Sequence, residues 1–301
     1  MKWYPNLLIF IFFIFVFLGF YAQSPVVVSS AKKNFLTLIN KNELPQDSVK
    51  RGLKISREWD LPQILKEISG INFLDSNHFA CIQDEIGSIF LLNSSSGLIE
   101  TQIPFGPPGD YEAIAIVKGD AYVACADGRL YEISNYNSGK PSVKEYGTHL
   151  TVKQNVEGLA YDAINKRLLV AIKGKEENNS FYKGIYAFDL VTKKMPVKPV
   201  LRINIQDIVF NKNRKKTLIS NIHPSEIAIH PVTGDLYITD ASRPQLLIMD
   251  NTGKIKDLIP LDKNDFPKPE GITFSPAGEC YIANEGKKQQ PAKLLLVDLK
   301  P

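Results

Sequence analysis

The sequence is poor in the side chains that build disulfide frameworks and transition-metal sites. Its 301 residues include four histidines and only three cysteines, Cys81, Cys125 and Cys280. These cysteines are few and far apart, which excludes a disulfide framework and a zinc site of the usual spacing. Free cysteine is among the most buried residue types, so we expect three buried free thiols.

Charge of one sign and long helical patterns are lacking as well. The formal net charge is +4, and 23% of the residues are charged. This balance gives no reason to expect nucleic acid or an anionic membrane surface as a partner. The 44% of hydrophobic residues exclude a disordered chain. The one helix-like segment, residues 61–68, is short, so the composition indicates a domain built from strands.

The N-terminus carries the one long hydrophobic run, residues 7–20, which follows Lys2 and precedes Ala22. A basic start, a short apolar stretch and a small residue before a polar one are typical of a secretory signal peptide, here residues 1–22. An uncleaved membrane anchor is the alternative, because this segment is about long enough to span a bilayer if tilted. We expect a linker at 23–52 and a domain at 53–301. The domain is then periplasmic or secreted, or anchored to the inner membrane through the N-terminal segment.

Five short segments can be aligned with one another. Each reads Ser or Glu, usually a small residue, an aliphatic residue, a small or polar residue, and a large apolar residue; residues 157–161, for example, read Glu-Gly-Leu-Ala-Tyr. Each copy is followed by a turn and by two further apolar strands. The leading residues are separated by 43, 45, 68 and 45 positions, and they are Ser69, Glu112, Glu157, Ser225 and Glu270.

Short strands that repeat at about 44 residues per unit predict an all-β fold, a β-propeller of five four-stranded blades. The last unit stops at Leu299 after its third strand, so the segment 53–61 is the natural donor of the missing strand and would close the ring. Six blades are the alternative. The longest spacing has about 24 residues beyond the period, too few for another blade. We expect these residues, 198–221, to be an insertion, and the basic run 212–216 to be a solvated loop.

The inner strand of each propeller blade lines the central channel, so the five leading residues are expected to ring one mouth of it. Converging carboxylates repel one another and must take up protons, admit water or bind a cation. Oxygen ligands suit Ca²⁺, or else Mg²⁺, better than zinc or copper. The predicted metal ligands are therefore Ser69, Glu112, Glu157, Ser225 and Glu270. Alternatively, the glutamates bind backbone amides at the blade edges without any ion.

The second strand of each blade returns to the same end, so the loops after it open at this mouth. The cationic side chains of these loops are suited to binding phosphate or carboxylate groups. His223 is a candidate base, although an isolated histidine before a proline is more often a plain loop residue. No nucleophile elbow or phosphate-binding glycine loop is present. The predicted ligand-binding residues are Asp84, Asp127, Lys173, Lys175, His223, Asp240, Arg243 and Glu285.

The aligned motifs Ser-Gly-Ile, Glu-Ala-Ile, Glu-Gly-Leu-Ala-Tyr and Glu-Gly-Ile follow an N-terminal hydrophobic segment at blade spacing. In this they resemble the SdiA-regulated family of bacterial propellers, and through it NHL-repeat, phytase-like and gluconolactonase-like propellers. The resemblance covers about residues 55–299. It implies an exported or membrane-anchored propeller with a divalent ion in the channel. Lys173 and Glu285 stand where the family tends to carry Lys and Glu, whereas Glu226 departs from the common pattern.

Three functional hypotheses follow. The leading one is an exported propeller that binds a small ligand or a protein partner at a carboxylate-rich channel mouth, together with Ca²⁺. The second is a metal-dependent phosphoesterase or lactonase that acts at the same mouth, where the metal would polarise the substrate and acidify a water molecule. The third is an interaction propeller without any ion. A shared fold does not decide among them.

Overall fold

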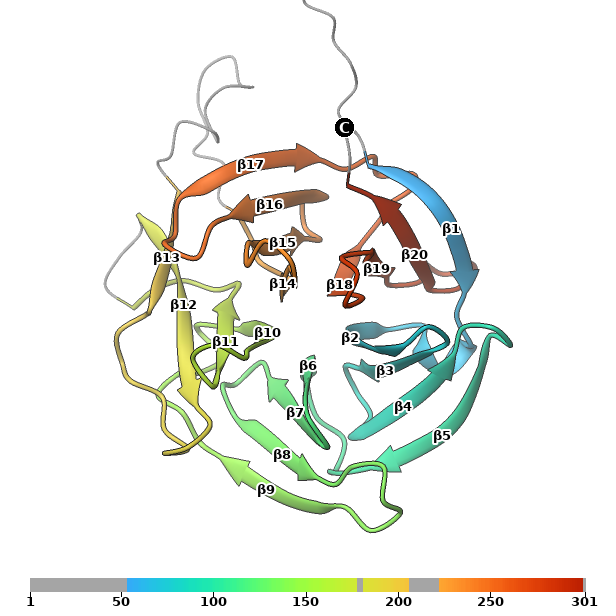
Figure 1. Ribbon diagram of the computed structural model, residues 1–301, viewed down its shortest axis with the longest axis horizontal. Coiled ribbons are helices and arrows are strands. Elements are labelled where there is room, and N and C mark those ends of the chain that lie inside the picture. The colour runs from blue at the N-terminus through green and yellow to red at the C-terminus, as the bar shows by residue number, and fades with distance from the viewer. Residues whose placement is uncertain (1–52, 178–180, 206–221, 300–301) are drawn as a thin grey trace, which may run out of the picture. The chain divides into compact units, whose positions relative to one another are not determined.

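Five antiparallel sheets of four strands each form a ring around a central channel (Figure 1). The computed structural model describes residues 53–177, 181–205 and 222–299, all within the unit Arg51–Pro301. The predicted five-bladed propeller is confirmed, and the six-bladed alternative is wrong. The expected signal peptide and linker lie outside the described residues. Among the described residues, no helix is long and apolar enough to cross a membrane.

Each blade runs from an inner strand at the channel to an outer strand at the rim. Blade one contains β2 (Ile68–Asp75), β3 (His78–Gln83), β4 (Ser88–Asn93) and β5 (Leu98–Pro104). Blade two contains β6 (Tyr111–Val117), β7 (Asp120–Cys125), β8 (Leu130–Ser134) and β9 (Ser142–Tyr146). Blade three contains β10 (Val156–Asp162), β11 (Arg167–Ile172), β12 (Tyr182–Asp189) and β13 (Leu201–Asn204). Blade four contains β14 (Glu226–Ile229), β15 (Leu236–Asp240), β16 (Gln245–Met249) and β17 (Ile255–Pro260).

Blade five closes the ring with strands from both ends of the domain. It contains β18 (Pro269–Phe274), β19 (Cys280–Asn284), β20 (Lys293–Asp298) and, at its outer edge, β1 (Lys54–Asp60). The β1 strand pairs antiparallel to β20, with Ile55 opposite Val297. The predicted closure by the N-terminal strand is therefore confirmed. A single 3₁₀ turn, η1 (Gln63–Leu65), leads from β1 to blade one within the described chain.

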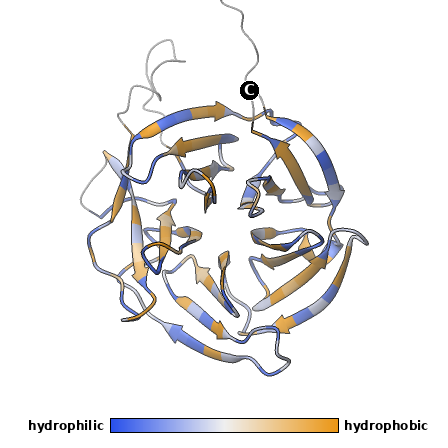
Figure 2. Ribbon diagram, viewed as in Figure 1, coloured by the Kyte–Doolittle hydropathy of each residue, from blue (hydrophilic) through white to orange (hydrophobic). Residues whose placement is uncertain are grey.

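Burial explains the strand sequences. The second strands are almost continuously apolar because both of their faces pack against neighbouring blades; β3 and β11, for example, are buried at every position after the first. The outer strands are mostly exposed and carry polar side chains, as Figure 2 shows for β5 and β9. A strand with both faces covered requires a hydrophobic run rather than an alternating pattern.

The hydrophobic core is divided into five clusters, one between each pair of neighbouring blades. The blades approach closely at the small residue of each motif: a Cβ atom at Gly158 would stand 2.3 Å from Cγ2 of Ile227 in the next blade. Cys81, Cys125 and Cys280 lie in second strands, are buried in three of these clusters and are free thiols, as expected.

The predicted insertion at 198–221 is wrong in its first part. Residues Leu201–Asn204 form β13, the outer strand of blade three, because the chain still has to complete that blade after β12. The extra length therefore lies beyond Asn204 and in the loop between β11 and β12. Most of the expected insertion, 206–221 with its basic run, falls outside the described residues.

Candidate functional site

The leading Ser or Glu of the repeat occupies a special backbone position. In four blades it is the extra residue of an irregularity in the pairing between the first and second strands, which shifts the register around Ser69, Glu112, Glu157 and Glu270. A bulge of this kind bends the strand and redirects the side chain of the extra residue. In blade four, Ser225 directly precedes β14. We call the end of the channel at which these five residues lie the mouth.

Glu157 and Lys173 form the centre of the mouth. The Nζ atom of Lys173 lies 3.1 Å from both carboxylate oxygens of Glu157, and Nδ2 of Asn155 donates to Oε1 of Glu157 at 2.6 Å. Glu157 is 3% exposed. Burial raises the pKa of Glu157 to about 7, although the neighbouring ammonium acts in the opposite direction. Burial alone would lower the pKa of Lys173, but the charges of Glu157, Glu270 and Glu112 outweigh it and raise that pKa. The charges of three glutamates from three blades thus favour one ammonium group.

The loop that carries Lys173 is held by its own neighbours. A Cβ atom at Gly174 would lie 2.2 Å from the Lys153 carbonyl oxygen, so only glycine lets this loop pass so close to the preceding turn. The Nζ atom of Lys183 donates to the carbonyl oxygens of Lys173, at 2.6 Å, and of Gly174. These contacts fix the backbone from which the Lys173 side chain extends over the channel.

Glu112 is paired with an acid. Burial, the charges of Glu157 and Asp110, and a side-chain hydrogen bond with Asp110 together raise the pKa of Glu112 to about 9. Two carboxyl groups that share a hydrogen bond hold one proton between them near neutral pH. Glu112 therefore faces the mouth as a neutral carboxylic acid, which can donate a hydrogen bond or release its proton when a cation arrives.

A second lysine compensates the acids of blade five. The Nζ atom of Lys268 lies 3.3 Å from Oε1 of Glu270 and also forms an ion pair with Glu285. Asp84 lies nearby in blade one. Burial, together with the charges of Glu67, Glu285 and Glu85, raises the pKa of Asp84 to about 6. The mouth therefore extends from Glu112 across to the loop after β19.

The two serines of the predicted ring serve the backbone instead. The Oγ atom of Ser69 donates to the Tyr111 carbonyl oxygen at 2.6 Å, which ties blade one to blade two. The Oγ atom of Ser225 accepts from the Ala241 N–H at 3.0 Å. Both hydroxyls are buried, at 5% and 1% residue exposure.

The remaining predicted ligand residues divide into buried and outward-facing groups. The carboxylate of Asp240 is fully buried and accepts from the backbone N–H groups of His223, at 3.0 Å, and Arg243, at 2.9 Å. Burial lowers the pKa of His223. Asp127 forms an ion pair with Arg129 at 2.8 Å, and Lys175 is exposed. Asp240 therefore organises a turn, while Asp127 is paired with an arginine of its own blade.

Sequence reasoning found only His223 of a second ring of residues at the mouth. The residue two positions before each leading Ser or Glu also belongs to this end of the channel, and the repeat itself was a signal that would have found it. In three blades this residue contacts the leading glutamate, as the pairs of Asp110, Asn155 and Lys268 with Glu112, Glu157 and Glu270 show. The full set is Glu67, Asp110, Asn155, His223 and Lys268.

Glu226 lies where the other copies carry Gly or Ala. Its Oε1 atom accepts from the N–H groups of Leu159 and Ile227, both at 2.8 Å, and so connects blades three and four. Its Oε2 atom is buried and has no partner among the described residues. Burial raises the pKa of Glu226 well above its ordinary value. Burial therefore favours the neutral acid form of this carboxyl group, whose role the sequence left open.

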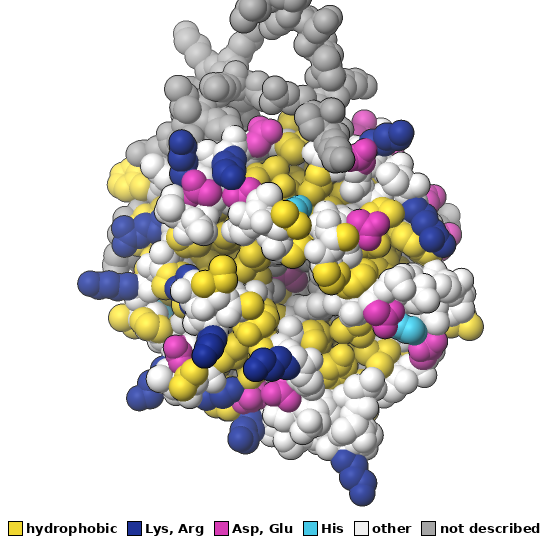
Figure 3. Space-filling view, viewed as in Figure 1, with side chains coloured by type: hydrophobic (Ala, Val, Ile, Leu, Met, Phe, Trp, Pro, Cys, Tyr) yellow, Lys and Arg dark blue, Asp and Glu magenta, His cyan; other side chains and the backbone are white. Residues whose placement is uncertain are grey.

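The aliphatic position of the repeat narrows the channel. Its five residues are at most 2% exposed and belong to the lining of a cavity of about 160 Å³ between the inner strands; they are Ile71, Ile114, Leu159, Ile227 and Ile272. Figure 3 shows the ring hollowed at its centre, with hydrophobic side chains around the hollow. The carboxylates of the mouth therefore give way to a ring of aliphatic side chains between the inner strands.

The residues of the mouth, as they are placed, do not fit the calcium site that the sequence suggested. Within the part of the chain that the structure describes, no group of three His, Cys, Asp or Glu side chains could hold a metal ion. Lys173 and Lys268 take the carboxylates of Glu157 and Glu270, and the two serines bond to the backbone. Seven or so free oxygen ligands are the usual requirement of Ca²⁺. We therefore derive no chemistry through a metal.

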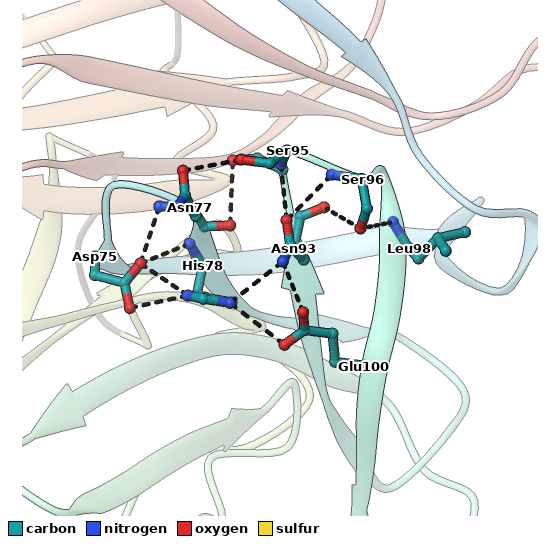
Figure 4. A network of polar contacts seen from close by, with 9 residues as sticks. Asp75, Asn77, His78, Asn93, Ser95, Ser96, Leu98 and Glu100 are labelled. Atoms are coloured by element: carbon teal, nitrogen blue, oxygen red, sulfur yellow. Dashed lines mark hydrogen bonds and ion pairs between the residues drawn. The ribbon is translucent and has the colours of Figure 1, made fainter.

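A polar network lies at the far end of blade one, away from the mouth (Figure 4). The Nδ1 atom of His78 contacts Oδ1 of Asp75 at 2.8 Å, and its Nε2 atom contacts Oε2 of Glu100 at 3.3 Å. The hydrogen bond to Asp75 is the largest cause of a raised His78 pKa. The network joins the β2–β3 turn to the outer strands. Because it is exposed, we interpret it as a structural contact at the surface and not as a binding site.

A family model for the SdiA-regulated proteins matches residues 50–288, most of the chain and nearly the whole propeller. The chain belongs to the SdiA-regulated family. The sequence matches no curated protein at a significant level. The classification of this SdiA-regulated propeller thus rests on the family model and on the fold.

Two solved structures share the fold of this SdiA-regulated protein. One is a glutaminyl cyclase from Myxococcus xanthus, with a TM-score of 0.55 and 15% identity over 82% of this chain and 95% of that chain. The other is a PQQ-bound aldose sugar dehydrogenase from Streptomyces coelicolor, with a TM-score of 0.51 and 12% identity over 82% of this chain and 98% of that chain. At such low identity they show the propeller architecture alone.

Proposed function

We propose that this SdiA-regulated propeller is an exported binding protein whose channel mouth takes a positively charged group of a small ligand or protein partner. One observation carries the proposal: Lys173 forms an ion pair with the buried Glu157, and the charges of glutamates from three different blades raise the pKa of its ammonium group. A lysine supplied by the chain itself occupies the position in which a cation is most favoured. The same surroundings favour the ammonium or amidinium group of a ligand.

The balance of charge at the mouth supports this reading. The acidic groups are Asp110, Glu112, Glu157, Glu270 and Glu285, and the two lysines that pair with them are Lys173 and Lys268. Glu112 is held neutral by Asp110 and its surroundings and can ionise when a cation approaches. A cationic group would then gain a charge-assisted hydrogen bond, which is stronger than a neutral one.

Calcium enters the proposal as a competitor. For Ca²⁺ to bind, Lys173 would have to leave Glu157, and Glu112 would have to lose its proton. The metal-dependent hydrolase is the second hypothesis, and it needs the same rearrangement. Export is proposed from the hydrophobic run at residues 7–20 and the small residue Ala22 that follows it.

Thermal melting of the purified protein with putrescine or with CaCl₂ tests the proposal. We expect putrescine to raise the melting temperature of the wild type. Glu112→Gln should weaken the diamine at least about tenfold, or ~1.4 kcal/mol, because the neutral amide cannot ionise. Asp127→Asn is the matched control, since Asp127 is paired with Arg129, and it should bind putrescine like the wild type.

Three results would decide against an organic cation. Stabilisation by CaCl₂ but not by putrescine would favour Ca²⁺ as the cation bound at the mouth. Metal-dependent turnover of p-nitrophenyl phosphate or γ-butyrolactone, abolished by Glu157→Gln with the fold intact, would favour the hydrolase. Equal effects of putrescine on Glu112→Gln and the wild type would show that the diamine binds elsewhere.

A further inference from the structure

An open cavity of about 330 Å³ lies in blade five, between the outer strands β1 and β20 and the loops that precede β18 and follow β19. It is distinct from the central channel. Its size falls at the lower end of the range for small-molecule sites. The walls combine apolar surfaces, from Ile55, Pro267 and Pro291, with the polar side chains of Glu58, Asp60 and Asn284.

The amide of Asn284 is the unusual feature of this cavity. The residue is 2% exposed, lines the cavity, and has no hydrogen-bond partner for either Nδ2 or Oδ1 among the described residues. Buried polar groups are nearly always hydrogen-bonded, and leaving one unpaired destabilises the fold. The described chain offers neither group a partner, and both atoms are closed off from the open space of the cavity. A molecule bound in the cavity would reach the amide only if the atoms that cover it move, and it could then supply both partners.

Comparison with the other blades shows that this orphan amide is not a general property of the fold. The last residue of the second strand is also polar in blades one and four, where it is Gln83 and Asp240. The Oε1 atom of Gln83 accepts from the N–H groups of Glu85, at 2.5 Å, and Ile86, at 3.2 Å. Asp240 accepts from the Arg243 N–H and from Nε2 of Gln245, which follow it, and from the His223 N–H of the segment before β14. In these blades the chain itself satisfies the side chain.

The loop after β19 uses its amides differently. The Glu285 N–H donates to the Lys268 carbonyl at 3.0 Å, and the Gly286 N–H donates to the Lys66 carbonyl at 2.8 Å. Both of these donors are therefore used by neighbouring segments and not by Asn284. The loop is thereby held away from the strand end and forms a wall of the cavity, with Asn284 inside.

Three of the four acids that line the cavity, Glu58, Asp60 and Glu285, are paired with a lysine. Lys293 contacts Glu58 at 3.1 Å and Asp60 at 3.8 Å, and Glu285 is paired with Lys268. A charged ligand would have to compete with these ion pairs. A neutral ligand that offers both donors and acceptors fits better, since a primary amide and paired carboxylates can both bond to hydroxyl groups.

We propose that this blade-five cavity binds a polyhydroxylated molecule such as a saccharide, with the Asn284 amide donating to one hydroxyl and accepting from another. The proline rings and Ile55 provide apolar surface for the C–H groups of the sugar. This cavity borders the mouth, because Glu285 belongs to both, but the ligand proposed here depends on Asn284 and not on the glutamates of the ring.

Saturation-transfer NMR on the purified protein, with D-glucose, D-galactose and N-acetyl-D-glucosamine as probes, tests the proposal. We expect at least one of these sugars to bind the wild type. Asn284→Leu, which has almost the same shape, should weaken that sugar about tenfold, equivalent to ~1.4 kcal/mol. Its melting temperature should equal or exceed that of the wild type, because an unpaired buried amide is replaced by an apolar group.

Gln83→Met is the matched control at the equivalent position of blade one. Its amide is satisfied, so this variant should melt at a lower temperature and bind the sugar as the wild type does. The proposal is overturned if none of the three sugars binds the wild type, or if Asn284→Leu binds sugar unchanged. It is also overturned if Asn284→Leu loses as much stability as Gln83→Met, because the amide would then be paired within the chain. The putrescine experiment uses other variants, so failure at one site is not mistaken for failure at the other.

Discussion

Replacing Lys173 with methionine removes the ammonium at the centre of the mouth while keeping the length and the apolar stem of the side chain. The carboxylate of Glu157 then loses the Nζ atom that lies 3.1 Å from both of its oxygens and keeps the hydrogen bond from Asn155. Glu157 is only 3% exposed, so water cannot fully replace the lost partner. We expect the variant to be less stable wherever Glu157 is ionised.

The size of this effect follows from the burial of the two partners. Breaking a buried ion pair costs about 3–5 kcal/mol, but the Lys173 side chain is 26% exposed, which reduces the expected loss to ~2–3 kcal/mol at about pH 8.5. The folded pKa of Glu157 is about 7, above its ordinary value of 4.5, so folding already favours the protonated form between these values. At about pH 5.5 most of the carboxyl is protonated in both proteins, and the loss should be ~1 kcal/mol or less.

Urea unfolding of wild type and variant at the two pH values measures this difference. Removing the lysine raises the Glu157 pKa further, so the stability of the variant should keep falling with pH beyond the point at which the wild type levels off. Lys175→Met, an exposed lysine on the same loop, is the matched control and should change stability by less than about 0.5 kcal/mol at either pH. Equal losses for Lys173→Met at both pH values would refute the argument, because the loss would then not depend on the charge of Glu157.

Two further predictions concern groups outside this pair. Glu226→Gln should melt close to the wild type at neutral pH, because burial favours the neutral carboxyl and the amide oxygen can still accept from the N–H groups of Leu159 and Ile227. Glu226→Ala should lose about 1–3 kcal/mol of stability. A large loss in Glu226→Gln would show that the carboxyl is ionised. An NMR titration should place the His78 pKa above 6.5 and that of His149 below it, since Asp75 raises the first and burial lowers the second. Asp75→Asn should move the pKa of His78 back toward 6.5. The stability that this pair contributes is present below pH 6.5 and is lost as pH rises through the folded pKa. An unchanged His78 pKa in Asp75→Asn would contradict the contact.

The fold could be predicted because the repeat appears directly in the sequence. The aliphatic residues from Ile71 to Ile272 recur every 43 to 45 residues except for one spacing of 68, and each marks the same position on an inner strand. The closing strand could be predicted because the last unit ends one strand short. The insertion was misplaced because β13 is a short strand of four residues without a strong hydrophobic pattern.

The site was harder to predict, because its geometry depends on contacts between blades. The sequence placed Glu112, Glu157, Glu270 and Lys173 at one end of the channel, but it did not show that Lys173 would pair with Glu157. The serines of the same ring bond to the backbone, which no spacing reveals. Asn284 could not be singled out either, because whether its amide is paired depends on which acceptors the N–H groups of the next loop bind.

The closing strand has a consequence for how the protein is made. Four blades can assemble from contiguous stretches of chain, but β1 emerges first during synthesis and finds its partner β20 only after every other strand exists. Until then it is an unpaired strand in water, the kind of segment that promotes aggregation. Its sequence, KISREWD, alternates charged residues with few apolar ones. The strand that closes the ring thus has a largely polar sequence, which limits aggregation while the strand is unpaired.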